Sequence, residues 1–273
     1  MNATARRAEE FPDQIAGWND LASLVEHFSY FSAHDWLFRG VTDATHELVP
    51  KIGRLKTRAV KEDPVTRIKA RVPYRREDEL AVFQMFKQQA RSHILPAPST
   101  DLEWLAVAQH FGLPTRLLDW TESLFVAAWF AVEKAGAKPS KADSAIWVTR
   151  AVSPIEAADA ENPFEGERAR VYRPAYVSPR IAAQASVLVL CASPTEPFTP
   201  AFARRVVIAR DVEFLLKKRL NACGVNKRAL FPDMSGLADH LSWLHKQDYL
   251  AGYRERDASS VGATPDDSPE EPA

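Results

Sequence analysis

Thirteen residues, from Gln109 to Thr121, concentrate side chains that can bind a ligand or react with one. The stretch holds one side-chain amide, one imidazole, one guanidinium, one carboxylate and two hydroxyls, and large apolar residues alternate with them. Apolar helical segments flank it on both sides. Such surroundings indicate burial, and buried polar groups need hydrogen-bond partners. The stretch is therefore either a structural polar network or the floor of a binding site.

A further charged residue, Arg39, follows the apolar run 36–38 and precedes Gly40. A buried arginine must be paired or face a ligand, and its planar guanidinium suits a bidentate contact with phosphate or carboxylate. The glycine allows a ligand or another backbone segment to approach closely. We expect Arg39 to contact a ligand, and the alternative is an internal salt bridge to Asp119.

The side chains of the central stretch admit both binding and structural roles. His110 ends a helix, where the helix dipole favours its protonated form; it either orients a ribose or moves a proton, or it is a satisfied core residue. Gln109 can bind an amide or a hydroxyl, or the neighbouring backbone. We expect Asp119 to be buried and charge-paired, and the same turn could direct Arg116 into a cleft. One common cavity is expected for Arg39, Gln109, His110 and Arg116.

Two helices must hold this stretch in place. Thr100 and Glu103 form a capping box, so a helix begins there and runs to about residue 111. Gly112 supplies the left-handed conformation that commonly ends a helix. A second helix over 124–135 is apolar nearly all round, which predicts a central place in the core. Residues 115–120 are then expected to form a short crossover between the two helices.

The remaining pattern predicts an α+β fold. Helical spacing of apolar residues predicts helices over 19–32, 77–92, 211–224 and 236–247. Short apolar runs predict strands over 36–40, 144–149, 186–191 and 205–209. Residues 151–183 are expected to form an irregular excursion with one short helix at most. We expect the helices to pack on a small mixed β-sheet, with a cleft beside the strand that carries Arg39.

Composition narrows the class of protein. With 273 residues, 46% of them hydrophobic, the chain can bury a sizeable core, and its net charge of −1 gives no general nucleic-acid signature. Cys191 and Cys223 are too few and too far apart for a disulfide framework or a zinc site, and the histidines show no metal-ligand spacing. No apolar run reaches the length of a membrane span, and residues 1–10 lack a signal-peptide core. We therefore expect a cytoplasmic protein that contacts no membrane and uses no metal.

One segment departs from this neutral balance. Residues 51–76 contain ten Lys or Arg and only two acids. The segment is either a solvated loop or a rim that attracts phosphate or nucleic acid. Apart from Tyr74, it lacks the aromatic residues that would stack on bases.

Several motifs of the chain together resemble the FRG domain, a bacterial family named for its Phe-Arg-Gly motif. They are Phe38-Arg39-Gly40, Leu48-Val49-Pro50 with Arg54, the stretch 109–121, Phe130-Ala131, Arg180 with Gln184, and Leu230-Phe231-Pro232-Asp233. The similarity extends roughly over residues 20–247. In one departure, Ala185-Ser186-Val187 stands where the family usually shows a glycine and then an aromatic residue.

This resemblance implies the domain organisation. A single FRG domain is expected over 17–253, between a loose leader at 1–16 and an acidic tail at 254–273. The tail is too polar to bury apolar area, so we expect it to be disordered.

The resemblance implies less about function. FRG domains occur in bacterial and phage proteins, and the family is associated with conflict between them, which includes phage defence. The Phe-Arg-Gly strand is also similar to the aromatic-Arg-Gly strand of ADP-ribosyltransferases, in which the arginine helps to hold NAD. The expected function is therefore that of an ADP-ribosyltransferase-like enzyme with NAD as substrate. The alternative is a non-enzymatic module that senses a nucleotide, a nucleic acid or a phage component.

Under the enzymatic hypothesis each candidate residue has an expected role. Arg39 would hold pyrophosphate, His110 or Gln109 would contact ribose or the nicotinamide amide, and Gln184 would lie near the reacting carbon. The candidate catalytic residues are Gln184, His110 and Asp119. The candidate binding residues are Arg39, Gly40, Gln109, Thr115 and Arg116. The reaction calls for a nearby carboxylate, and within these motifs Asp119 is the only acid before the Asp233 turn.

Overall fold

The computed structural model describes residues 11–32, 34–54, 60–67, 69–136, 140–175 and 178–247. The expected acidic tail at 254–273 and the first ten residues lie outside these ranges.

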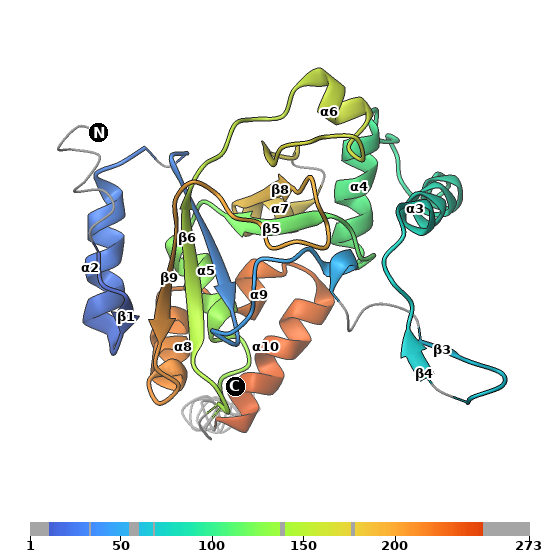
Figure 1. Cartoon of the computed structure of the whole chain (residues 1–273). Helices are drawn as coiled ribbons and strands as arrows, with labels where there is room; N and C mark the ends of the chain where they lie inside the picture. Colours follow the sequence, from blue (N-terminus) through green and yellow to red (C-terminus); the bar gives the residue numbers. More distant parts are fainter. Residues whose placement is uncertain are drawn as a thin grey trace, which may run out of the picture.

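A mixed seven-stranded sheet, in the order β1-β9-β6-β2-β5-β8-β7, forms the centre of the fold (Figure 1). Its strands are β1 (Gln14–Ile15), β2 (Trp36–Val41), β5 (Leu117–Thr121), β6 (Ser144–Arg150), β7 (Arg170–Tyr172), β8 (Ser186–Leu190) and β9 (Ala203–Ile208). The β1–β9 pair is parallel and the other neighbours are antiparallel. A separate hairpin pairs β3 (Val60–Glu62) with β4 (Lys69–Arg71). The expected α+β class is confirmed.

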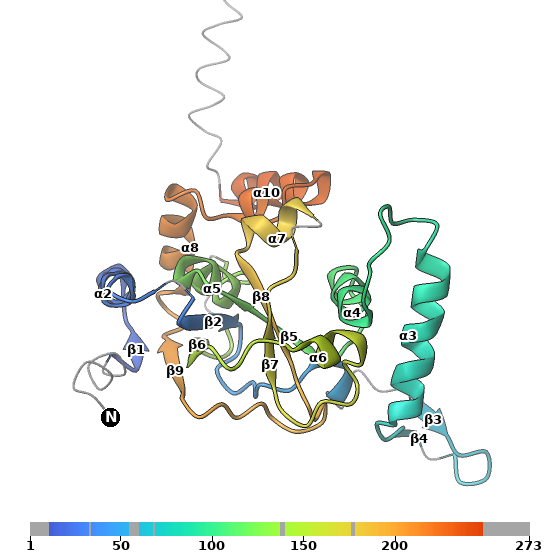
Figure 2. The same cartoon turned by 90° about the horizontal axis from the view of Figure 1, so that it is seen from above.

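Helices cover the sheet unevenly. They are α2 (Trp18–Ser29), α3 (Arg76–Ala90), α4 (Asp101–His110), α5 (Leu124–Ala131), α6 (Ala157–Glu161), α7 (Pro179–Ala183), α8 (Glu213–Ala222), α9 (Lys227–Leu230) and α10 (Met234–Lys246), with a short 3-10 turn at Lys51–Gly53. Helices α5, α7, α8 and α10 gather on one side of the sheet, whereas α3 stands beyond α4 at the far end (Figure 2).

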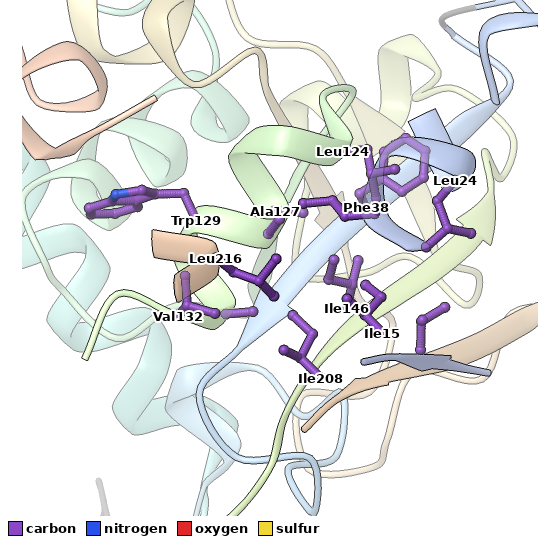
Figure 3. Packing of buried hydrophobic residues seen from close by; sticks show 14 of the residues in the cluster. Ile15, Leu24, Phe38, Leu124, Ala127, Trp129, Val132, Ile146, Ile208 and Leu216 are labelled. Carbon is purple, nitrogen blue, oxygen red and sulfur yellow. The ribbon is translucent and has the colours of Figure 1, made fainter. Parts of the chain in front are cut away.

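The largest core cluster lies between α5 and the strands β2, β6 and β9 (Figure 3). Phe38 of β2 packs there with Ile146, Ile208 and residues of α5. Gly40 lets α5 approach β2 closely, because a Cβ on this residue would lie 2.0 Å from the carbonyl oxygen of Ala127. The close approach that the sequence predicted at Gly40 is thus made by another backbone segment.

The expected crossover at 115–120 is wrong, because most of it belongs to the central strand β5. All five residues of β5 pair with β8, from Leu117 opposite Leu190 to Thr121 opposite Ser186. Leu118 and Trp120 pack on one face with Leu37 of β2, which leaves Asp119 on the opposite face. The alternation of side chains is therefore that of a strand, and the short length of β5 concealed the strand in the sequence.

The described part of the expected loose leader is ordered into the fold. Gln14 and Ile15 pair with Val207 and Ile208 of β9, and Ile15 is fully buried. Phe11 is also buried, against His27 and Phe28 of α2. Residues 11–15 are held by this apolar burial, which the charged sequence before them obscured.

The region 151–183 is less irregular than expected, since it contributes the edge strand β7 and the short helices α6 and α7. Within the described ranges, no helix combines the length and the apolar character that crossing a membrane requires.

Candidate functional site

A cavity of about 240 Å³ opens where β2 and β5 separate. The two strands share a single pair, Phe38 opposite Thr121, whereas β2 pairs with β6 and β5 pairs with β8 along their lengths. Beyond that pair the strands diverge, and side chains from α4, α5 and α7 close the gap. The polar residues among its lining are Arg39, Gln109, His110, Asp119, Thr121, Arg180, Gln184 and Ser186.

Arg39 compensates for the separation of the strands. Its Nη1 donates a hydrogen bond to the backbone carbonyl oxygen of Asp119, a group that lies beyond the single β2–β5 pair. The same Nη1 lies 4.0 Å from Oδ2 of Asp119. Burial lowers the pKa of Arg39, and the nearby charge of Asp119 opposes that shift. The internal contact expected as an alternative therefore exists, and Arg39 also faces the cavity.

Asp119 is not buried, which corrects the expectation from the sequence. Its side chain is 70% exposed, against 16% for Arg39. The reason is that Asp119 occupies the face of β5 opposite Leu118 and Trp120, where the strand borders the cavity and no apolar layer covers it.

A chain of hydrogen bonds orients the carboxylate of Asp119. The backbone N–H of Leu117 donates to Oγ1 of Thr115 at 3.1 Å, and that hydroxyl donates to Oε1 of Gln109. The amide nitrogen of Gln109 then donates to Oδ1 of Asp119 at 2.7 Å. Thr115 is fully buried and supports Gln109 from behind, so it does not line the cavity as the sequence predicted. The relay binds Oδ1 of Asp119 and makes no hydrogen bond to Oδ2.

Arg180 adds a second guanidinium to the cavity. It lies on α7, with its guanidinium carbon 4.2 Å from the centre of the Phe231 ring. Burial lowers the pKa of Arg180, and the charges of Asp119 and Asp233 oppose the shift. Arg180 was quoted for the family resemblance but not predicted as a site residue. Its spacing of four from Gln184, one helical turn, was the available signal.

His110 faces the cavity from the end of α4. Its pKa is lowered, first by burial and then by the positive charge of Arg180, while Asp119 acts in the opposite direction. The sequence predicted that the helix dipole would favour the protonated form. Desolvation and Arg180 outweigh that effect, so the imidazole is neutral at pH 7.

Arg116 does not share this cavity, so the predicted common site for Arg39 and Arg116 is wrong. Its guanidinium is 3% exposed and pairs with Glu79 of α3, with Nη2 2.7 Å from Oε2 and Nε 3.1 Å from Oε1. Further contacts reach Tyr74 and the carbonyl oxygen of Phe164. Burial acts to lower the pKa of Arg116, but the bonds and charge of Glu79 raise it overall. Arg116 therefore fastens α3 to the sheet.

Gln184 lines the cavity, but its side chain is engaged within the protein. Its side-chain amide nitrogen donates to the carbonyl oxygen of Leu230 at 2.9 Å, and its backbone carbonyl oxygen accepts from the hydroxyl of Thr121 at 2.7 Å. These bonds join α7, α9 and β5. The bond to Leu230 uses one N–H of the side-chain amide, and the catalytic role expected for Gln184 stays a prediction.

The family departure after Gln184 has a visible consequence. Ala185 adopts a φ of 42°, in the left-handed region that favours glycine. A glycine at this position, as the family usually shows, would take the same turn at lower cost.

The basic segment 51–76 is partly neutralised where it is described. Glu62 pairs with Arg67 and Lys69, and Asp78 pairs with Arg75. Residues 55–59 and 68 lie outside the described ranges. Within the part of the chain that is described, no group of three or more His, Cys, Asp or Glu is placed to hold a metal ion.

Comparison with known proteins gives one match. A family model for the FRG domain matches residues 34–140. No curated protein and no solved structure matches the chain. The matched segment is narrower than the 20–247 expected from the motifs. It includes Arg39, Gln109, His110 and Asp119, whereas Arg180 and Gln184 reach the cavity from outside it.

Proposed function

The chain carries an FRG domain over residues 34–140, and we propose that its cavity binds the nicotinamide–ribose end of NAD and catalyses ADP-ribosyl transfer. The observation that carries this proposal is the exposed carboxylate of Asp119, which is oriented by Gln109 and flanked by Arg39. Reaction at the ribose C1′ passes through an oxocarbenium-like state, which a fixed carboxylate stabilises.

Positive charge in the cavity supports recognition of the phosphates. Arg39 and Arg180 remain cationic at neutral pH, because a guanidinium stays protonated even when burial lowers its pKa. Planar guanidinium groups suit bidentate contacts with phosphate oxygens. The cavity of about 240 Å³ accommodates one end of a dinucleotide, and the rest would extend along its open side.

The proposed step uses Asp119 and His110. The bond between C1′ and the pyridinium nitrogen breaks, and its electron pair stays on that nitrogen, so nicotinamide leaves neutral. Asp119 stabilises the positive charge that develops on C1′ and the ribose ring oxygen. An acceptor hydroxyl or water then bonds to C1′ and gives up its proton to the imidazole of His110. A histidine whose pKa is lowered by burial is available as that base at pH 7.

Release of labelled nicotinamide from NAD tests this function. The protein would be incubated with NAD labelled in the nicotinamide ring, with water or cell lysate as the source of acceptors. Wild type should release nicotinamide, and Asp119→Asn should lower the rate by about 10²-fold or more. Asp211→Asn, which changes an exposed aspartate at the start of the α8 segment, is the matched control and should retain the wild-type rate. Release at the same rate by wild type and Asp119→Asn would contradict the proposal.

The second candidate function is nucleotide sensing without cleavage. It is favoured by the lining of the cavity, in which Asp119 is the single carboxylate among the described residues. A sensor would bind NAD or ADP-ribose and release no nicotinamide under any condition. Nucleic acid is a weaker candidate ligand, because acidic neighbours pair with described residues of the basic segment.

A further inference from the structure

A second cavity, of about 270 Å³, lies between the end of α5, helix α8 and helix α10. Trp129 and Glu133 border it on one side, and His240 and Trp243 border it on another. Lys217 of α8 forms part of its wall and is only 9% exposed. A lysine with so little exposure is unusual unless its amine is paired. The FRG motifs and the proposed function make no use of this cavity.

The amine of Lys217 has two hydrogen-bond acceptors. Its Nζ donates to the carbonyl oxygen of Glu133 at 2.5 Å and to that of Ala135 at 3.0 Å. Within the described residues no third hydrogen-bond acceptor of Nζ is found, and the Trp243 ring centre lies 5.4 Å away. A neutral amine has two N–H groups and one lone pair. The two carbonyl oxygens therefore satisfy both N–H groups of the neutral form and leave the lone pair available for reaction.

Burial of Lys217 favours that neutral form, and the charged groups around it act in both directions. Burial lowers the pKa of Lys217 to about 8, Glu133 opposes the shift and Lys227 adds to it. Lys227 itself pairs with Glu133 at 2.9 Å and lies 4.0 Å from Asp239 of α10. His240 also faces the cavity, and burial followed by the charge of Arg228 lowers its pKa. Lys246, from the last turn of α10, completes the charged lining.

We propose that Lys217 is a nucleophile that forms an imine with a small aldehyde or ketone bound in this second cavity. Desolvation and a neighbouring cation are the two conditions that activate lysines for this chemistry. The ligand carries an anionic group, which Lys246 attracts at the wall of the cavity. Trp129 and Trp243 supply apolar surface for its carbon frame.

The step balances without a further reactant. The lone pair of Nζ attacks the carbonyl carbon, and a carbinolamine forms as a proton moves to the oxygen. Water then leaves with that oxygen and the two hydrogens that the amine contributed, and a C=N bond remains. The imine nitrogen, when protonated, keeps one N–H for the carbonyl oxygen of Glu133 or Ala135. His240, neutral and in the same cavity, is placed to move the protons.

Reductive trapping with pyridoxal 5′-phosphate tests the proposal on the full chain. The aldehyde would be added at pH 7, sodium borohydride would reduce any imine to a stable amine, and peptide mass spectrometry would locate the product. Lys217 should be modified at least ten times faster than Lys134, an exposed lysine that lies between Glu133 and Ala135 in the sequence. The rate at Lys217 should reach half of its maximum near pH 8, following its pKa of about 8.

A variant that blocks the cavity shows whether the aldehyde reaches Lys217 through the cavity or whether Lys217 is simply accessible to reagents. Ser242 lines the cavity and is exposed, so Ser242→Trp should fill the space without touching the hydrogen bonds of Lys217. This variant should melt like wild type and lose the preferential labelling. Equal labelling of Lys217 and Lys134 in wild type would overturn the proposal and leave Lys217 as a structural residue that binds the carbonyls after α5. Preferential labelling that persists in a folded Ser242→Trp would also overturn it. The test uses no NAD, so it is independent of the first cavity.

Discussion

Two polar clusters, one at the start of β5 and one at its middle, use the same residue types to opposite effect. At the start of the strand, Arg116 and Glu79 face each other with side chains 3% and 2% exposed. Beside the middle of the strand, Arg39 and Asp119 are 16% and 70% exposed. The first cluster is closed by α3, whereas the second borders a cavity where β2 and β5 diverge.

The two clusters differ in how many of their hydrogen-bonding groups find partners within the protein. Arg116 makes hydrogen bonds to Glu79, to Tyr74 and to the carbonyl oxygen of Phe164. The hydrogen bonds of Arg39 that the structure establishes reach a single carbonyl oxygen, and Asp119 keeps one carboxylate oxygen directed away from its relay. A closed cluster stabilises the fold, and an open one has capacity for a ligand. An arginine in an apolar stretch therefore acquires its role from the partners that the fold brings to it.

The largest effect is expected from breaking the ion pair of the closed cluster, which is formed by Arg116 and Glu79. Glu79→Gln removes the charge that compensates Arg116, so the free energy of unfolding should fall by about 3–5 kcal/mol. Urea unfolding would measure the change. The matched control is Asp78→Asn, which breaks the exposed pair with Arg75 and should cost less than about 1 kcal/mol. Equal effects of the two variants would show that the Arg116 cluster is not a structural fastening.

The next largest effect is expected at Gly40, where α5 packs against β2 beside the open cluster of Arg39 and Asp119. Gly40→Ala places a methyl group against the carbonyl oxygen of Ala127, and the resulting displacement of α5 should cost about 1–3 kcal/mol. Gly136→Ala is the control, because nothing lies within 4 Å of a Cβ added there. Thermal melts that coincide for the two variants would mean that α5 does not depend on the close approach at Gly40.

A smaller effect, of the opposite sign, is expected beside the open cluster. Ala185→Gly relieves the left-handed conformation at φ 42° and should stabilise the protein by about 1 kcal/mol. The same exchange at Ala182, inside α7, should destabilise it by about 1 kcal/mol. Differential scanning calorimetry of both variants checks the sign, and destabilisation by Ala185→Gly would contradict the conformational explanation.

The exchange Asp119→Asn should barely change stability, in contrast to what the burial and charge pairing expected from the sequence would imply. The carboxylate is largely exposed, and an asparagine oxygen can still accept from Gln109. We expect the free energy of unfolding to change by less than about 1 kcal/mol, while nicotinamide release is lost. A variant that unfolds much more easily than wild type would place Asp119 with Arg116 among the structural residues.

The smallest effect is a pH dependence that originates at His110. Its pKa is lower in the folded protein than in the unfolded chain, so the unfolded state binds more protons as the pH falls below 6.5. Stability should therefore decrease from pH 7 towards pH 5, and less steeply in His110→Gln. His240 contributes in the same direction, so the difference between the two proteins is the informative quantity. Parallel stability profiles would contradict a buried neutral His110.

The sequence predicted the features that depend on local chemistry. Thr100 caps α4 as expected, with its hydroxyl accepting from the backbone N–H of Glu103, and Gly112 ends the helix with a φ of 93°. The strand of the Phe-Arg-Gly motif was also predicted, as were Gln109 and His110 beside Arg39 in one cavity.

The features that the sequence concealed depend on distant partners. The direction of Arg116 follows from the alternation of β5 and from Glu79, which lies on a helix 37 residues earlier in the chain. Arg180 reaches the cavity because α7 leads directly into β8, the neighbour of β5. Neither contact follows from local spacing, because each requires the order of strands in the sheet.

Calorimetric titration with NAD tests most directly whether the open cluster is a nucleotide site. Wild type should bind NAD. Arg39→Lys keeps the charge but loses the planar fork, so its Kd should be higher by about tenfold or more, a loss of about 1.4 kcal/mol of binding free energy. Arg219→Lys, at an exposed arginine of α8, should bind like wild type. Identical Kd values for all three proteins, or no binding by wild type, would contradict the assignment of this cavity.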